Sequence, residues 1–522
     1  MSNALSIFTD FGYRAGKADT LDALGRVYQS QGKYKEAIDK HEEALIIRRE
    51  IGDRAGEATS QNNLGDAYHA LGNYNEAEAA HTKALKIFDD PEIGAIAGLA
   101  NARNNLGVVY CSLKRYNEAE FLIQKAQKTR QKIGDLAGEA DSLCNLGNIY
   151  YILGEYLTAK NSYLYAFIIL RKIGHCEFQA KALNGLGDVY LATNHYENAA
   201  SNYEEAWQKF HHIGNPDKAK KTRRNQADTY YKQGQYLGSN KNYQEAINAY
   251  KKAQSIFVEI NDIDRARECQ TQQVAVQRDE AQDYYNRGKD LQSRKQYQEA
   301  IDAYEQARSI FVEIKENQRA KECQSNQADT YCEQGQDLRS NKNYKEAINA
   351  YEQARNIFAA IGDSYRAKQS ENQKVEVRRD EAHDYYTIAK DLRDRKNYQV
   401  AIATYEKARN IFVEIEDIYR AQKCQWNQAD TYCEQAQDLR SNQNYQEAID
   451  TYNKAQSIFL EINDRDRARE CQSNQAETYS ELGDNLRSNK KYQEAINAYK
   501  QAERIFREIG DNESTASSTG SS

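Results

Sequence analysis

The sequence has little proline and no long apolar segment. Only two prolines, Pro91 and Pro216, occur in 522 residues, so few positions interrupt a helix. No run of 18 apolar residues is present, which excludes a membrane-spanning helix of the usual length. The first ten residues lack the basic and then apolar order of a secretory signal. We therefore expect a cytoplasmic protein of long helices that has no membrane partner.

The chain also lacks a large excess of charge of either sign. The net charge is −7, which is small for this length, and neither half of the chain has the basic excess typical of nucleic-acid binding. Phosphate contacts dominate that kind of binding. We therefore expect no nucleic-acid partner.

Motifs of catalytic and nucleotide sites are missing as well. The chain has no glycine-rich phosphate loop, no His-Glu-x-x-His and no Gly-x-Ser-x-Gly. The eight histidines are dispersed, and His41 and His81 occupy a repeated position that holds tyrosine in later units. That pattern indicates helix packing. We expect no catalysis, no metal and no cofactor.

The cysteines follow a repeat and do not form a cluster. Four of the nine share the context Arg-Ala-x-x-Cys-Gln: Cys269, Cys323, Cys424 and Cys471. A metal site would need close pairs with histidine nearby, and a disulfide framework would suit a smaller secreted chain. We interpret these cysteines as small apolar residues in helix interfaces.

One motif, Tyr-x-x-Ala-x-x-x-(Tyr or similar)-x-x-Ala, is present in abundance. It recurs eleven times, at Tyr34, Tyr74, Tyr116, Tyr156, Tyr196, Tyr243, Tyr297, Tyr344, Tyr398, Tyr445 and Tyr492. A period of 40 to 54 residues predicts a solenoid, in which each unit buries its apolar face against its neighbours.

Each unit has the pattern of two helices. Residues 55–71 have helical apolar spacing, Gly72 and Asn73 form a turn, and a second helix begins at Tyr74. Between units, Asp53 follows a glycine and is expected to cap the next helix. Pro91 and Pro216 each follow a capping residue, which favours the first position of a helix.

The motif residues resemble tetratricopeptide repeats over about residues 4–511. In one unit the matching positions are Leu64, Gly65, Tyr68, Gly72, Tyr74, Ala77 and Ala84. The resemblance implies an all-α, right-handed superhelical solenoid of antiparallel helix pairs, with about 11 repeats and a partial helix near residues 4–8. The 40-residue period and Asn-Asn-Leu-Gly at 62–65 and 104–107 are similar to kinesin light chains and G-protein-signalling modulators. Those adaptors hold extended peptides in a concave groove.

The repeat spacing divides the chain. Residues 1–215 have repeats of about 40 residues, residues 216–511 have repeats of 47 or 54, and residues 512–522 form a small polar tail that we expect to be disordered. The longer repeats add one or two heptads before the tyrosine. Seven residues lengthen a helix by about 10 Å and nearly preserve its buried face, so we expect long first helices.

The resemblance places the groove on the first helices. In the first half its candidates are Asn62, Asn63, Asp66, Asn104, Asn105, Asn145, Asn148, Asn184 and Asp188. An asparagine both donates and accepts hydrogen bonds, so it suits a peptide backbone; bonding within the scaffold is an equal alternative. The lysines of the chaperone-tail carboxylate clamp are absent at Thr59, Asn101 and Asp141, which disfavours that partner class.

The second half is more acidic at the equivalent positions. They are Asp228, Asp329, Glu333, Asp430, Glu434, Glu477 and Glu481. These residues indicate either a groove for a basic peptide or a solvated face.

Two main functions fit the sequence. The first is a non-catalytic scaffold or adaptor that binds peptide segments of partner proteins, and the second is a sensor whose solenoid changes shape on binding. A third is a self-associating spacer, because the chain opens within a second helix, near Ala4, and ends on an uncovered one. Such ends favour either head-to-tail association or frayed terminal turns.

Overall fold

The computed structural model describes residues 13–519, and this part of the chain contains 22 helices and no strand. The helices form successive pairs. The first helices of these pairs are α2 (Arg14–Ser30), α4 (Arg54–Leu71), α6 (Ile96–Ser112), α8 (Leu136–Ile152), α10 (Cys176–Ala192), α12 (Pro216–Ser239), α14 (Ile263–Ser293), α16 (Asn317–Ser340), α18 (Ser364–Asp394), α20 (Ile418–Ser441) and α22 (Arg465–Ser488). The second helices are α3 (Tyr34–Glu50), α5 (Tyr74–Phe88), α7 (Tyr116–Ile133), α9 (Tyr156–Ile173), α11 (Tyr196–His212), α13 (Tyr243–Glu259), α15 (Tyr297–Glu313), α17 (Tyr344–Ile361), α19 (Tyr398–Glu414), α21 (Tyr445–Glu461) and α23 (Tyr492–Thr519). Every motif tyrosine begins a second helix, which confirms the predicted all-α array of antiparallel pairs.

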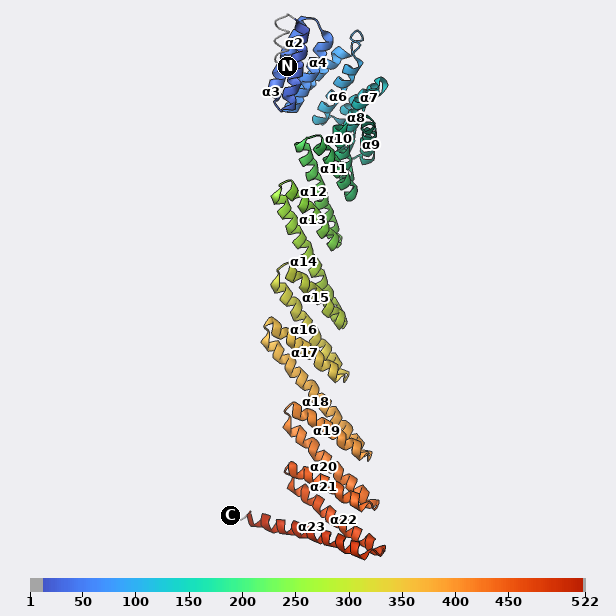
Figure 1. Ribbon diagram of the computed structural model, residues 1–522, viewed down its shortest axis with the longest axis vertical. Helices are drawn as coiled ribbons and strands as arrows, with labels where there is room; N and C mark the ends of the chain where they lie inside the picture. Colours follow the sequence, from blue (N-terminus) through green and yellow to red (C-terminus); the bar gives the residue numbers. More distant parts are fainter. Residues whose placement is uncertain (1–12, 520–522) are drawn as a thin grey trace. The chain divides into compact units, whose positions relative to one another are not determined.

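The chain divides into two compact units, unit 1 (residues 1–277) and unit 2 (residues 278–522), and the division falls within α14. In each unit the helices pack consecutively, first against second and second against the next first (Figure 1). The predicted partial helix near Ala4 lies outside the described residues. None of the helices in residues 13–519 has the length and apolar character needed to cross a bilayer.

A glycine on each of several first helices faces a ring from its partner helix. A Cβ added at Gly65 would lie 2.6 Å from the His81 ring, and one at Gly187 would lie 2.6 Å from the Tyr203 ring. His41 and His81 are 0% and 1% exposed. The two histidines are therefore packing residues, as the repeat pattern predicts, and the glycines allow the close approach of the helices.

Side chains and glycines define the helix ends. The Asp53 carboxylate accepts a hydrogen bond from the Gly56 N–H (2.9 Å), and Gly72 ends α4 with φ of 88°. Pro216 is the first residue of α12, as predicted. The same prediction is wrong for Pro91, which lies in the turn before α6, because that turn continues to Ala95 before a helix begins.

The first helices lengthen in steps of seven residues. α2, α6, α8 and α10 have 17 residues and α4 has 18, α12, α16, α20 and α22 have 24, and α14 and α18 have 31. In α18, Ser370 and Val377 are one heptad apart and are both buried. The inserted heptads therefore extend single helices and keep their buried face, as predicted. The last helix, α23, continues to Thr519 and includes most of the small polar segment.

The repeated cysteines lie in the interfaces between helices. Cys269, Cys323, Cys424 and Cys471 are at most 1% exposed. In unit 2, Cys323 belongs to a cluster with Ala307 and Phe311. This burial confirms the interpretation of these cysteines as packing residues.

Candidate functional site

The nine groove candidates of the first half lie on four successive first helices of unit 1. Helix α4 contributes Asn62, Asn63 and Asp66, α6 contributes Asn104 and Asn105, α8 contributes Asn145 and Asn148, and α10 contributes Asn184 and Asp188. Asn104 is buried, Asn148 is exposed, and the other seven are half-buried. The repeat thus aligns these side chains on a partly accessible surface.

Hydrogen bonds connect several of these residues from helix to helix. The Asn105 Nδ2 donates to the Asp66 Oδ1 (2.8 Å), and the Asn104 Nδ2 donates to the Asp141 Oδ2 (3.2 Å). The Lys181 Nζ donates to the Asp141 Oδ1 (3.2 Å) and to the Asn145 Oδ1 (3.3 Å). We call these six residues the polar ladder: Asp66, Asn104, Asn105, Asp141, Asn145 and Lys181. It links α4, α6, α8 and α10.

Other candidates bond to the second helix of their own repeat. The Asn62 Oδ1 lies 3.0 Å from the His81 Nδ1, and the Tyr163 hydroxyl donates to the Asn148 Oδ1 (2.6 Å). The Tyr203 hydroxyl donates to the Asp188 Oδ1. These acceptors orient buried rings and therefore have a role within the scaffold.

Two amide atoms on this surface lack a partner. The Asn63 Nδ2 and the Asn184 Oδ1 are buried, and neither has a hydrogen bond within residues 13–519. The other end of the Asn184 amide donates to the Thr222 Oγ1 (3.0 Å). Buried polar atoms are nearly always paired in native proteins, so these two atoms are exceptions within this polar surface.

The charge state of the surface depends on burial. Loss of hydration raises the pKa of Asp66 to about 7. The hydrogen bond from Asn105 lowers this pKa, and the nearby Asp141 carboxylate raises it further. Loss of hydration also raises the pKa of Asp188. Burial lowers the pKa of His81 to about 3, so its imidazole stays neutral. Within the ladder, Asp66 therefore keeps its proton to a higher pH than an ordinary aspartate does.

The stability of unit 1 is expected to depend on pH through Asp66. Its pKa is raised from 3.8 to about 7 by folding, so the folded state retains a proton that the unfolded state has lost. Stability from this group is present below about pH 4 and is lost as the pH rises through 7. Thermal unfolding should show the Tm of the wild type falling relative to that of Asp66→Asn between pH 5 and 8. A Tm difference that stays constant over this range would contradict the assignment.

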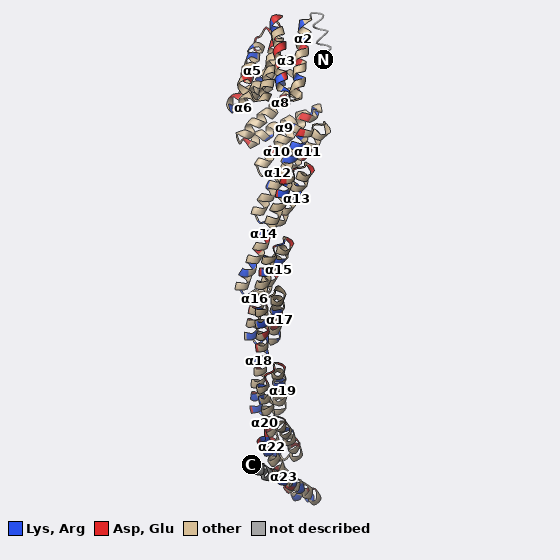
Figure 2. Ribbon diagram, turned by 90° about the vertical axis from the view of Figure 1, so that its left-hand side faces the viewer, with Lys and Arg blue, Asp and Glu red and all other residues tan. Residues whose placement is uncertain are grey.

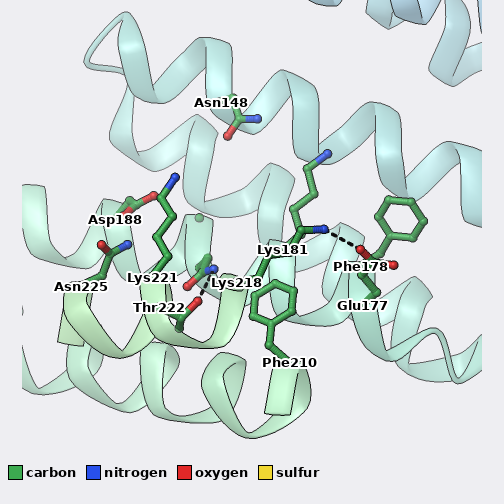
Figure 3. A pocket seen from close by; sticks show the side chains of 12 residues that line it. Asn148, Glu177, Phe178, Lys181, Asp188, Phe210, Lys218, Lys221, Thr222 and Asn225 are labelled. Atoms are coloured by element: carbon green, nitrogen blue, oxygen red, sulfur yellow. Dashed lines mark hydrogen bonds and ion pairs between the residues drawn. The ribbon is translucent and has the colours of Figure 1, made fainter. Parts of the chain in front are cut away.

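A cavity of about 430 Å³ lies between α8, α10 and α12 (Figure 3). Its lining combines aromatic, amide and charged side chains: Asn148, Glu177, Phe178, Lys181, Asn184, Gly185, Asp188, Phe210, Lys218, Lys221, Thr222 and Asn225. The Lys218 Nζ donates to the Glu177 Oε1 (2.6 Å), and Lys221 extends toward Asp188 in Figure 3. Lys181 bonds to Asp141, so each of the three lysines that line the cavity has a carboxylate near it.

One repeated position in the sequence carries a signal for this cavity. Thr59, Asn101 and Asp141 occupy one repeated position, and the same 40-residue step leads to Lys181 and then to Lys221. Lysines are therefore absent at that position from α4, α6 and α8 and present in α10 and α12. Extending the comparison to α10 and α12 identifies both cavity lysines.

The acidic candidates of the second half are already paired. Asp228 bonds to Arg265 in unit 1, and within unit 2 the pairs are Asp329–Arg366, Glu333–Gln292, Asp430–Arg393, Asp430–Arg467, Glu434–Arg393, Glu477–Arg440 and Glu481–Arg440. Basic and acidic residues are interspersed along the helices of unit 2 (Figure 2). Six of the seven carboxylates lie in ion pairs that link one first helix to the next, and Glu333 bonds to the neutral Gln292.

Comparison with known proteins identifies repeats over most of the chain. Tetratricopeptide repeat families match residues 3–90, 98–164, 139–210, 227–257, 279–360 and 427–508. No curated protein sequence matches.

Several solved structures are similar in fold. BtubC from P. vanneervenii is 21% identical over 41% of this chain and 89% of that one, with a TM-score of 0.36. A signal-transduction ATPase with a tetratricopeptide repeat sensor from Pyrococcus horikoshii is 16% identical over 68% and 47%, with a TM-score of 0.37. A kinesin light chain with nearly identical repeats from Podosopora anserina is 19% identical over 38% and 96%, with a TM-score of 0.31. These likenesses concern the fold alone.

Proposed function

Because this chain belongs to the tetratricopeptide repeat family, whose domains generally bind proteins, we propose that unit 1 holds an extended peptide segment of a partner. The peptide lies along the first helices α4 to α10, over the polar ladder. In this proposal the protein is a non-catalytic scaffold, and its role is to position the partner. The ladder residues are held in place by one another, so little side-chain entropy is lost on binding.

The single observation that carries this proposal is the pair of unpartnered amide atoms. An extended backbone presents both N–H and C=O groups. Both side chains are half-buried, and rotation of each amide would bring its covered atom to the surface. The Asn63 Nδ2 would then suit a backbone carbonyl, and the Asn184 Oδ1 a backbone N–H. They lie on α4 and α10, so one extended segment that spans the ladder would reach both.

The cavity supports a preference for the kind of side chain. Phe178 and Phe210 provide apolar walls, and the ion pairs Lys218–Glu177 and Lys181–Asp141 leave little free charge. A neutral side chain with an apolar body therefore fits better than a carboxylate. Unit 2 is not assigned a peptide, since its candidate carboxylates are already paired with basic or amide groups.

Selection of peptides from a random library on the full chain tests the proposal. The double variant Asn63→Ala/Asn184→Ala removes both unpaired groups and should weaken selected peptides about 30-fold, since each hydrogen bond contributes about 1 kcal/mol. Binding is measured by fluorescence anisotropy. The control is Asn75→Ala/Asn117→Ala, which alters two exposed asparagines on second helices and should leave the Kd unchanged. Equal Kd values for both double variants would argue against peptide binding on this surface.

A further inference from the structure

Helix α9 exposes an apolar face. Its buried residues include Ala159, Tyr163 and Ala166. On the opposite side, Leu157, Leu164 and Ile168 are 73%, 42% and 43% exposed. Seven and eleven residues separate Leu157 from the other two, so all three lie within a narrow arc of the helix. Tyr165 extends this face and is 62% exposed.

The equivalent positions of the neighbouring repeats are polar. In α7, 40 residues earlier, they hold Asn117, Gln124 and Lys128. In α11, 40 residues later, they hold Glu197, Glu204 and Gln208. The repeat therefore folds with polar residues at these positions. The apolar side chains of α9 are not needed for packing and need another explanation.

The charged residues within α9 itself have one sign. Helix α9 contains Lys160, Arg171 and Lys172 and no acidic residue. Arg171 and Lys172 are exposed, and neither has an ion pair within residues 13–519. An apolar stripe with a basic border complements a partner that has an apolar stripe with an acidic border.

We propose that this face of α9 docks an amphipathic acidic helix of a partner protein. Leu157, Leu164 and Ile168 contact the apolar stripe of that helix, and Arg171 and Lys172 face its carboxylates. Helices commonly bind through such i, i+3, i+4 and i+7 anchors. The site lies on a second helix, whereas the polar ladder lies on first helices, so it is separate from the proposed peptide surface.

A synthetic peptide with leucine on one helical face and glutamate elsewhere is the probe, titrated into the full chain by fluorescence anisotropy. The variant Leu157→Asn/Leu164→Gln/Ile168→Lys introduces the residues that α7 has at these positions, and circular dichroism confirms that it folds. We expect at least a tenfold rise in the Kd for this variant. Asn63→Ala/Asn184→Ala should bind the probe as the wild type does, so a failure of the peptide surface is distinguished from a failure of this one.

Four results would overturn the inference. One is unchanged binding in the triple variant, and another is equal binding of a peptide with lysine in place of glutamate. Binding to phosphatidylserine vesicles, with none to the acidic peptide, would assign the face to a membrane. A wild-type dimer in analytical ultracentrifugation that the triple variant abolishes would assign it to a second copy of the chain.

Discussion

Replacing Asp22 by alanine is expected to lower the local free energy of unfolding of α2–α4 by about 3–5 kcal/mol. Asp22 is 2% exposed and bonds to residues of the next two helices. Its carboxylate accepts from the Ser60 hydroxyl (2.7 Å) and from the Arg48 guanidinium (3.4 Å), and it lies 2.8 Å from the His41 Nδ1. Removing the carboxylate takes away one of the negative charges that balance the buried Arg48 guanidinium, and this costs more than the loss of the hydrogen bonds alone.

Hydrogen exchange over the peptides of α2–α4 measures this loss. Asp19→Ala is the matched control, since Asp19 also bonds to Arg48 (2.6 Å) but its side chain is 71% exposed. An exposed ion pair contributes at most about 1 kcal/mol, so the amides of α2–α4 in Asp19→Ala should exchange only slightly faster than those of the wild type. Equal destabilisation by the two substitutions would show that the burial of Asp22 has no special role.

Deleting five residues from α18 should disrupt unit 2, whereas deleting seven should not. At 3.6 residues per turn, loss of residues 371–375 rotates one end of the helix relative to the other by about 140°. Ala382 and Ala389, now fully buried, would then lie on the wrong side of the helix. We expect the five-residue deletion to cost more than about 4 kcal/mol of stability.

Loss of residues 371–377 rotates one end of α18 relative to the other by only about 20°. Ser370 then occupies the place of Val377, and α18 shortens from 31 residues to the 24 of α16. Urea unfolding followed by circular dichroism compares the two deletions. If the seven-residue deletion destabilises the chain as much as the five-residue one, the heptads do not act as interchangeable lengths of helix.

The helices could be predicted because the period and the motif are local signals. Tyrosine begins every second helix, and small residues such as Gly65 mark the close contacts. Pro91 shows the limit of this reasoning, because a turn of several residues separates it from the next helix. A capping residue before proline indicates a chain reversal but does not define where the helix starts.

The hydrogen bonds of the candidate surface could not be predicted in the same way. Asn105 bonds to Asp66, 39 residues earlier, and Lys181 bonds to Asp141, 40 residues earlier. These partners depend on side-chain conformations across a helix interface. The buried network of Asp22 was missed for the same reason, since nothing in a local pattern separates it from the exposed Asp19.

The most direct test of peptide binding by unit 1 is a hydrogen-exchange footprint of a selected peptide on the full chain. The proposal predicts slower exchange in α4, α6, α8 and α10, centred on Asn63 and Asn184, with little change in α3, α5, α7, α9 and α11. Slower exchange confined to these second helices, or to unit 2, would contradict it.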